Sequence, residues 1–228
     1  MPDQISTATV SFKSNGDIAN GYLAYPTDKI QSPAIIVIQE WWGVDEHIKD
    51  ITERLARLGF AALAPDLYHG QITSEPDEAR KLAMSLEYDK AAKEIDGAAH
   101  WLTQQPFAGG PHFGCIGFCM GGGLALTTAI RNDSVAATIV YYGGLPNPAS
   151  KLESIHSPVL AFYGEGESER ANQLQETLIN HSKPIELHIY EKAAHGFFND
   201  TNKSGYDIRA ASDSWPRAIA FFRKLITN

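Results

Sequence analysis

The sequence predicts an α/β fold in which a mostly parallel central sheet carries helices on both faces. Short apolar runs rich in β-branched residues alternate along the chain with stretches of helical periodicity. Several of these runs, such as "PAIIVIQ", are apolar throughout rather than alternating, which is typical of strands that are covered on both sides. With 228 residues and 43% hydrophobic content, the chain can fill one large core, so we expect residues 1–228 to form a single domain.

The first third of the chain begins with a predicted hairpin. The segments "ATVSFKS" and "IANGYLAYP" flank Asn15 and Gly16, a dipeptide that readily supplies the two positive φ angles of a type I′ turn. After the strand "PAIIVIQ" the apolar residues recur at intervals of three, four and three, which predicts a helix that ends at Gly59. That apolar stripe consists of Ile48, Ile51, Leu55 and Leu58.

The same alternation continues to the C-terminus. We expect a strand in "FAALAPDLY", helices around residues 77–86 and 89–103, a strand in "HFGCIGF" and a helix in "GGGLALTTAI". The strands "AATIVYYG" and "PVLAFYG", a helix around residues 169–181 and the strand "IELHIY" follow. A long last helix starts near Tyr206, and its predicted sheet-facing residues are Ile208, Ala211, Trp215, Ala218, Phe222 and Leu225.

The composition excludes several classes of protein. A formal charge of −8 and the lack of a long Lys/Arg run argue against nucleic-acid binding. No segment approaches the length of about 20 apolar residues that a membrane-spanning helix needs, and the N-terminal residues lack the pattern of a secretory signal. Two cysteines, Cys115 and Cys119, cannot build a disulfide framework or a structural zinc site. We therefore expect a cytoplasmic protein with free thiols.

The segment "GFCMG", residues 117–121, has the G-x-S-x-G spacing of a nucleophile elbow with cysteine in place of serine. At such a turn between strand and helix the glycines remove side chains that would collide. The helix that follows directs its first amide groups and its positive dipole end at the sulfur, which favours the reactive thiolate. The alternative is that Cys119 is a small buried residue in a tightly packed turn, which is our interpretation of Cys115.

A base and an acid follow the cysteine in the order that hydrolases with this elbow use. Of the eight histidines, His195 is the best placed, because it lies in a loop directly after the strand "IELHIY". The strand "PVLAFYG" is followed by three candidate acids in one loop, Glu165, Glu167 and Glu169. Alternate side chains on such a loop point the same way, so the pattern alone does not choose among them. Asp66 also ends a strand, but we interpret it as a loop or helix cap.

The chain resembles the dienelactone hydrolase family, a cysteine-dependent branch of the α/β-hydrolase fold, over nearly its whole length. The matching segments occur in the family's order and are "VIQEWWGVDEHIKDITERLARLGFAALAPDLYHG", "IGFCMGGG", "VYYGG", "FYGEGE" and "AAHGFFND". The resemblance implies that Cys119 is the nucleophile and His195 the base. It also implies that Glu40 is a carboxylate beside the cysteine, and that the backbone N–H groups of Trp41 and Met120 form the oxyanion hole.

Two positions depart from the family pattern. The family usually has aspartate where this chain has Glu167, which we take as the orienting acid because glutamate serves in other triads. Members that cleave dienelactones hold the substrate carboxylate with two arginines. Asn199 stands in the place of one of them, and Arg80 is the candidate for the other, with an exposed helical arginine as the alternative interpretation. Glu40 has an alternative role too, as a cap of the following turn.

These residues predict a hydrolase that cleaves a lactone or a small carboxylic ester through an acyl-enzyme. Its only expected partner is the small-molecule substrate, and the chemistry needs no metal and no cofactor. We expect a monomer or a weak homodimer. Two other functions remain open at this point: a redox-responsive thiol protein, which would need a resolving thiol near Cys119, and an α/β-hydrolase-fold protein that binds a ligand without converting it.

Overall fold

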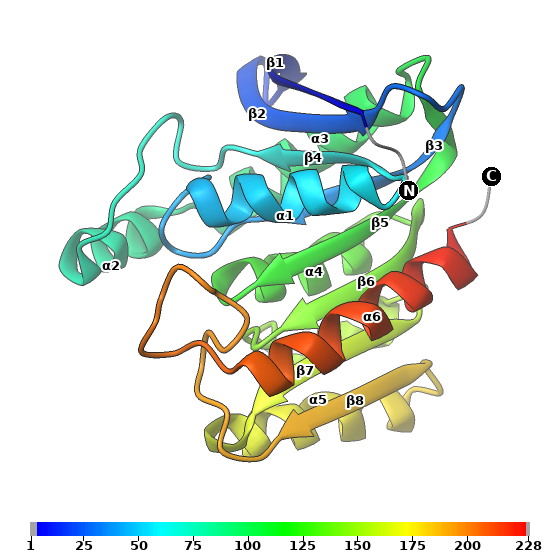
Figure 1. Cartoon of the computed structure of the whole chain (residues 1–228). Coiled ribbons are helices and arrows are strands. Elements are labelled where there is room, and N and C mark those ends of the chain that lie inside the picture. Colours follow the sequence, from blue (N-terminus) through cyan, green and yellow to red (C-terminus); the bar gives the residue numbers. More distant parts are fainter. Residues whose placement is uncertain (1–3, 227–228) are drawn as a thin grey trace. The chain divides into compact units, whose positions relative to one another are not determined.

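A computed structural model describes residues 4–226, and the strands in it form one mostly parallel sheet (Figure 1). The eight strands are ordered β1-β2-β4-β3-β5-β6-β7-β8. Their bounds are β1 Ile5–Ser14, β2 Asp17–Pro26, β3 Ser32–Ile38, β4 Ala61–Pro65, β5 Ala108–Phe118, β6 Val135–Tyr141, β7 Val159–Gly164 and β8 Ile185–Tyr190. The α/β class predicted from the sequence is confirmed.

Helices α1 to α5 lie between strands in the chain, and α6 follows the last strand. Their bounds are α1 Glu46–Arg57, α2 Pro76–Ser85, α3 Tyr88–Thr103, α4 Met120–Arg131, α5 Ser168–Asn180 and α6 Ile208–Leu225, with short 3₁₀ turns at Ala149–Ser154 and Glu165–Glu167. The two helices expected around residues 77–86 and 89–103 are thus α2 and α3. By its internal contacts the chain divides into two compact units. The second unit is Cys115–Leu225, and the first consists of the residues up to Gly114 together with Ile226, so the division along the chain falls within β5. The single-domain expectation stays a prediction, and each unit is described by itself.

The first unit begins with the predicted hairpin. Asn15 and Gly16 have φ angles of 53° and 81°, and β1 pairs with β2 antiparallel from Ser14 opposite Asp17. The strand β2 also pairs antiparallel with β4, whereas β3 and β4 are parallel. The residues of β4 are all buried, as are nearly all of those in β3, which agrees with their continuous apolar sequences.

Caps at both ends and a buried apolar stripe explain why residues 46–57 form helix α1. The Asp45 carboxylate accepts a hydrogen bond from the Ile48 amide at 3.0 Å and caps the N-terminus. At the other end Gly59 has a φ of 98°, the left-handed conformation that commonly follows a helix. Of the predicted stripe, Ile48, Ile51 and Leu55 are fully buried. Helix α1 packs on β2 and β4 on the near face of the sheet, with α3 on the far face (Figure 1).

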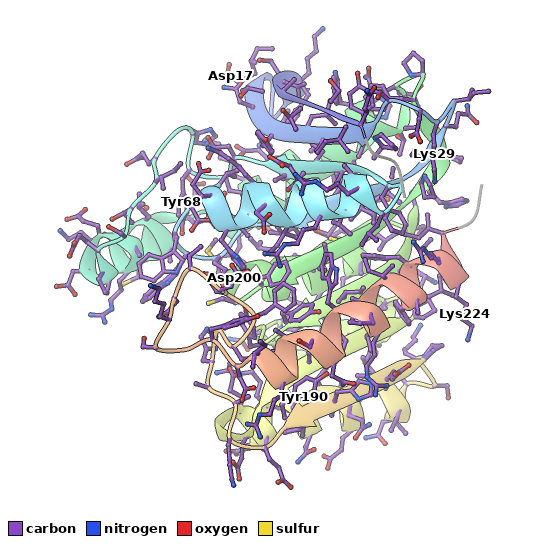
Figure 2. The ribbon with its side chains drawn as sticks, viewed as in Figure 1. Asp17, Lys29, Tyr68, Tyr190, Asp200 and Lys224 are labelled. Carbon is purple, nitrogen blue, oxygen red and sulfur yellow. The ribbon has the colours of Figure 1, made fainter. Side chains whose placement is uncertain are left out.

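The second unit continues the sheet with parallel pairs of β6 with β7 and β7 with β8. Helix α6 packs on β6 and β7 on the near face, while α4 and α5 lie on the far face (Figure 1). A hydrogen bond joins the end of β8 to α6: the Tyr190 hydroxyl donates to Asp213 Oδ2 at 2.8 Å. Tyr190 is labelled below α6 in Figure 2.

The prediction of which residues of the last helix face the sheet is partly wrong. Ile208 is 65% exposed, and the buried residues of α6 are Ala210, Ala211, Ser214, Ala218, Ile219 and Phe222. At 3.6 residues per turn Ile208 lies about 80° around the helix from Ala218, inside the arc between Ala210 and Ile219. Its exposure therefore reflects its place as the first residue of α6, at the end of the helix, rather than the side of the helix on which it lies.

Candidate active site

Cys119 lies alone between the end of β5 and the start of α4, in a backbone conformation that is unusual for a residue with a side chain. Its φ is 54° and its ψ is −117°. The Cys119 amide donates to the Tyr141 carbonyl at the end of β6 at 3.0 Å, and its own carbonyl accepts from the Gly122 amide at 3.0 Å. These two backbone hydrogen bonds fix the conformation of the turn, as a nucleophile elbow between strand and helix requires.

Glycines make this turn possible. A Cβ atom on Gly117 would lie 2.0 Å from the Gly121 carbonyl oxygen, so no side chain fits there, as the sequence predicted. A Cβ on Gly122 would lie 2.7 Å from the Gly143 Cα, a close approach between α4 and the segment after β6 that the sequence analysis did not identify. The paired glycines in "MGGG" and "YYGG" were the available signal for this contact.

His195 lies between Cys119 and Glu167. Its Nε2 is 3.1 Å from Cys119 Sγ, and its Nδ1 is 2.9 Å from Glu167 Oε1. The three side chains come from the turn after β5, the turn after β7 and the loop after β8, and all three belong to the Cys115–Leu225 unit. The structure thus brings together three of the residues singled out in the sequence, in the geometry of a nucleophile, base and acid.

The three candidate acids have different surroundings. Glu167 contacts the imidazole, and its side chain is only 11% exposed. Glu165 instead accepts a hydrogen bond from the Lys192 amide at 2.9 Å through Oε2, which joins the turn after β7 to the loop that carries His195. Glu169 does not lie in the loop as expected but in the first turn of α5, where it is exposed.

The loop that carries His195 is packed tightly against the end of β7. A Cβ on Gly164 would lie 2.4 Å from the Ala193 carbonyl oxygen, so the two backbones touch. Lys192 has a φ of 62°, and the Ala193 amide donates to the Tyr190 carbonyl at 3.3 Å. These contacts fix where the loop leaves β8 and so fix the position of the imidazole.

The surroundings of His195 raise its pKa to about 10. Burial is the largest influence and by itself lowers the pKa, but hydrogen bonds to Cys119 and Glu167 and their negative charges outweigh it. The imidazole next to the sulfur therefore carries a proton at neutral pH, which is the form that can donate to a leaving group.

An aromatic cluster supports the imidazole. The Tyr142 ring lies edge-on to His195 with centroids 5.0 Å apart, and the Tyr142 amide donates to the Phe162 carbonyl at 2.7 Å. Tyr142 is fully buried and has a φ of 42°. The sequence analysis quoted "VYYGG" without a role for this tyrosine, and its position follows from a contact between segments far apart in the chain.

Other predicted site residues belong to the first unit, and their roles stay predictions. Glu40 follows β3 by two positions and is 4% exposed, and Trp41 comes next in the chain. Arg80 on α2 is 65% exposed, and its Nη1 lies 3.6 Å from Asp77 Oδ1. Asp66 is a loop cap as expected, since its carboxylate accepts from the amides of Tyr68 and Gly70.

Two further positions lie in the second unit. Met120 is the first residue of α4 and directly follows Cys119. Asn199, which stands in place of an arginine of the family, is buried, and its Oδ1 accepts from the amide and the hydroxyl of Thr201 at 3.1 and 2.6 Å. Its side-chain oxygen is thus used within its own loop.

Residues 4–226 contain no helix with the length and apolar character to cross a bilayer. Within the same range, no three His, Cys, Asp or Glu side chains are arranged to hold a metal ion.

Comparison with known proteins agrees with this architecture. Residues 19–226 match the model of the dienelactone hydrolase family. A candidate carboxymethylenebutenolidase of Saccharolobus solfataricus is 33% identical over 260 residues, covering 95% of this chain and 98% of the relative. One of Aquifex aeolicus is 30% identical, covering 94% and 96% of the two chains. Among solved structures, a candidate dienelactone hydrolase from Klebsiella pneumoniae is 27% identical with a TM-score of 0.88, covering 97% of this chain and all of that one.

Proposed function

The chain belongs to the dienelactone hydrolase family, and on that basis we propose that it hydrolyses small carboxylic esters or lactones through an acyl-enzyme on Cys119. The observation that carries the proposal is the position of His195, with one ring nitrogen 3.1 Å from Cys119 Sγ and the other 2.9 Å from Glu167 Oε1. A base held between a nucleophile and an acid is the arrangement that acyl transfer requires.

In the first half of the reaction, the Cys119 sulfur attacks the carbonyl carbon of the substrate and a tetrahedral oxyanion forms. The backbone N–H groups of Met120 and Trp41 are proposed to stabilise that oxyanion. When the intermediate collapses, the bond from carbon to the leaving oxygen breaks, and His195 Nε2 gives its proton to that oxygen. The product of this half is a thioester on Cys119, with the alcohol released or, for a lactone, still attached as a hydroxyl group.

In the second half, neutral His195 takes a proton from water as the water oxygen attacks the thioester carbon. Collapse of this second intermediate expels the Cys119 thiolate and releases the carboxylic acid, which returns His195 to its protonated form. Glu167 holds the Nδ1 proton throughout and so keeps Nε2 directed at the sulfur. This sequence of steps consumes water and needs no metal or cofactor.

Two residues of the first unit complete the proposal. Glu40 is buried, and a buried carboxylate beside the sulfur is proposed to accept the hydrogen bond of the thiol and hold it neutral until substrate displaces that contact. The thiol proton then passes to His195 Nε2, which gives the thiolate and imidazolium that begin the first half of the reaction. Arg80 is proposed to contact a substrate carboxylate. Its exposed pairing with Asp77 favours the simpler interpretation, a solvent-facing helical arginine.

A redox role has less support. Cys115 is fully buried in β5, four residues before Cys119. The three residue steps from Cys115 to Phe118, the end of the strand, span about 10 Å, whereas the Cα atoms of a disulfide lie within about 7 Å of each other. Because Cys115 lies inside the strand and its thiol is fully buried, it is a poor resolving thiol for Cys119.

The test is turnover of a panel of chromogenic esters and small lactones by the purified protein, with and without a thiol alkylator and with and without a chelator. We expect alkylation to abolish turnover in the native protein and in the control variant Cys115→Ala, and the chelator to have no effect.

Cys119→Ala should be inactive, and the turnover of Cys119→Ser should be reduced roughly a hundredfold or more, because a serine hydroxyl is far harder to ionise. Native-like rates in Cys119→Ala would overturn the nucleophile. A folded native protein that binds members of the panel without converting any of them would favour the ligand-binding alternative.

A further inference from the structure

The acid of the proposed site has a second hydrogen-bond partner besides the imidazole. Glu167 Oε1 accepts from His195 Nδ1 at 2.9 Å and also from Arg170 Nη1 at 3.1 Å. Arg170 lies in the first turn of α5, three residues after Glu167, and nothing in the sequence had pointed to it. One carboxylate oxygen is thus shared by the imidazole and a guanidinium.

The surroundings of Glu167 make this second partner important. The Glu167 side chain is 11% exposed, whereas that of Arg170 is 46% exposed, so the pair joins a nearly buried acid to a partly solvated base. The other carboxylate oxygen, Oε2, is buried and has no hydrogen-bond partner among the described residues. The orientation of the carboxylate therefore depends on the two bonds to Oε1, one of which comes from Arg170.

The charge of His195 changes during the proposed reaction, while that of Arg170 does not. When His195 gives its proton to the leaving group, Glu167 loses the positive charge of the imidazolium. A carboxylate removed from water needs a compensating charge and hydrogen bonds to stay in place. A guanidinium stays protonated at any pH at which the protein is folded, so Arg170 supplies that charge in both states of the imidazole.

The length of the acid adds to the need for a second contact. A glutamate side chain has three rotatable bonds, and a longer side chain loses more freedom when it is fixed. A donor on the same helical turn limits that freedom, because residues three apart on a helix are neighbours.

We infer that Arg170 is a positioning residue of the site, which holds the Glu167 carboxylate against His195 Nδ1 in both protonation states of the imidazole. This inference rests on the proposed function, since it assigns Arg170 a part in the same reaction. In this role Arg170 acts through Glu167, to which its guanidinium donates.

The kinetic test compares Arg170→Met, Arg170→Lys and Glu167→Gln, together with the double variant, on an ester that the native protein converts. We expect Arg170→Met to lower kcat about tenfold with KM within twofold, and Arg170→Lys to recover most of the loss. In the Glu167→Gln background, Arg170→Met should change kcat less than twofold, because the residue through which it acts is already absent. The matched control is Arg217→Met, which breaks a partly exposed pair on α6 and should leave kcat unchanged.

A second measurement does not depend on turnover. The downfield NMR resonance of the His195 Nδ1 proton reports its bond to Glu167, and we expect it to broaden or disappear in Arg170→Met and to return in Arg170→Lys. An unchanged resonance with an unchanged kcat in folded Arg170→Met would overturn the inference, as would an equal loss of kcat in the native and Glu167→Gln backgrounds. If the native protein converts no substrate, the proposed function fails, while the resonance still tests the contact.

Discussion

At the scale of single residues, the account depends on the conformation of Cys119 and the charge of His195. The positive φ of Cys119 places its side chain on the outside of a sharp turn, where the sulfur meets His195 Nε2 at 3.1 Å. The pKa of His195 is raised to about 10, so its imidazole is protonated below that pH and loses the proton above it. The conformation depends on nearby Gly117 and Gly122 as well as on distant Tyr141, whereas the pKa depends on residues that lie far away in the sequence.

The raised pKa predicts the pH dependence of the reaction and its response to Glu167→Gln. In the native protein kcat/KM should fall on the alkaline side near pH 10, as the imidazolium loses its proton. Removal of the Glu167 charge takes away one of the influences that raise this pKa, so the alkaline fall should move to lower pH. We expect kcat itself to drop by roughly 10²–10⁴-fold, as it does when the orienting acid of other triads is removed.

The controls for this prediction are the two neighbouring acids. Glu165→Gln keeps an oxygen that can accept from the Lys192 amide, and Glu169→Gln changes an exposed residue on α5, so both should stay near the native rate. Glu167→Asp should also lose activity, because the shorter side chain withdraws the carboxylate from His195. A Glu167→Gln protein with native kcat and an unmoved alkaline fall would remove Glu167 from the site.

At the scale of elements, the site is formed where the turn after β5, the turn after β7 and the loop after β8 meet. Parallel strands such as β7 and β8 end at the same edge of a sheet, which brings their loops together. Backbone contacts then fix them, because Gly164 touches Ala193 and the Cys119 amide bonds to the Tyr141 carbonyl. The precision of the site thus comes from close backbone packing that only glycine permits at several positions.

Gly117→Ala tests this packing directly. The new Cβ would lie 2.0 Å from the Gly121 carbonyl oxygen, so the turn must move, and we expect a loss of at least about 2–4 kcal/mol in the free energy of unfolding. Chemical denaturation measures the change. Gly144→Ala is the matched control, since a Cβ there meets no atom within 4 Å, and its unfolding should stay close to native. A Gly117→Ala protein as stable as the control would contradict the packing described for the turn.

Local signals were enough to predict most elements from the sequence. The Asn15-Gly16 turn and the α1 stripe follow from rules that involve only neighbouring residues. What the pattern of neighbouring residues did not decide depends on contacts across the fold. The exposure of Ile208 depends on how far along α6 the contact with the sheet extends, and the pairing of the imidazole with Glu167 rather than Glu165 depends on the loop that carries His195. No pattern in the sequence indicated a role for Arg170, because an arginine three residues after an acid is common on helices.

At the scale of the whole molecule, the fold is that of the α/β-hydrolases, and the residues predicted for the site fall in both of the units into which the chain divides. Cys119, Glu167 and His195 all lie in the Cys115–Leu225 unit, so their geometry is set within it. Glu40 and Trp41 belong to the other unit. The central claim, covalent catalysis by Cys119, therefore rests on contacts within a single unit.

Mass spectrometry of the protein quenched with acid during turnover tests that claim most directly. With a chromogenic acetate ester as substrate, the account predicts an acetyl group on the peptide that contains Cys119, formed within the first turnover and lost when substrate is exhausted. Cys119→Ala should show neither the adduct nor the turnover, and Cys115→Ala should show both. Sustained hydrolysis with no acyl group on Cys119, or with the acyl group on another residue, would contradict the account.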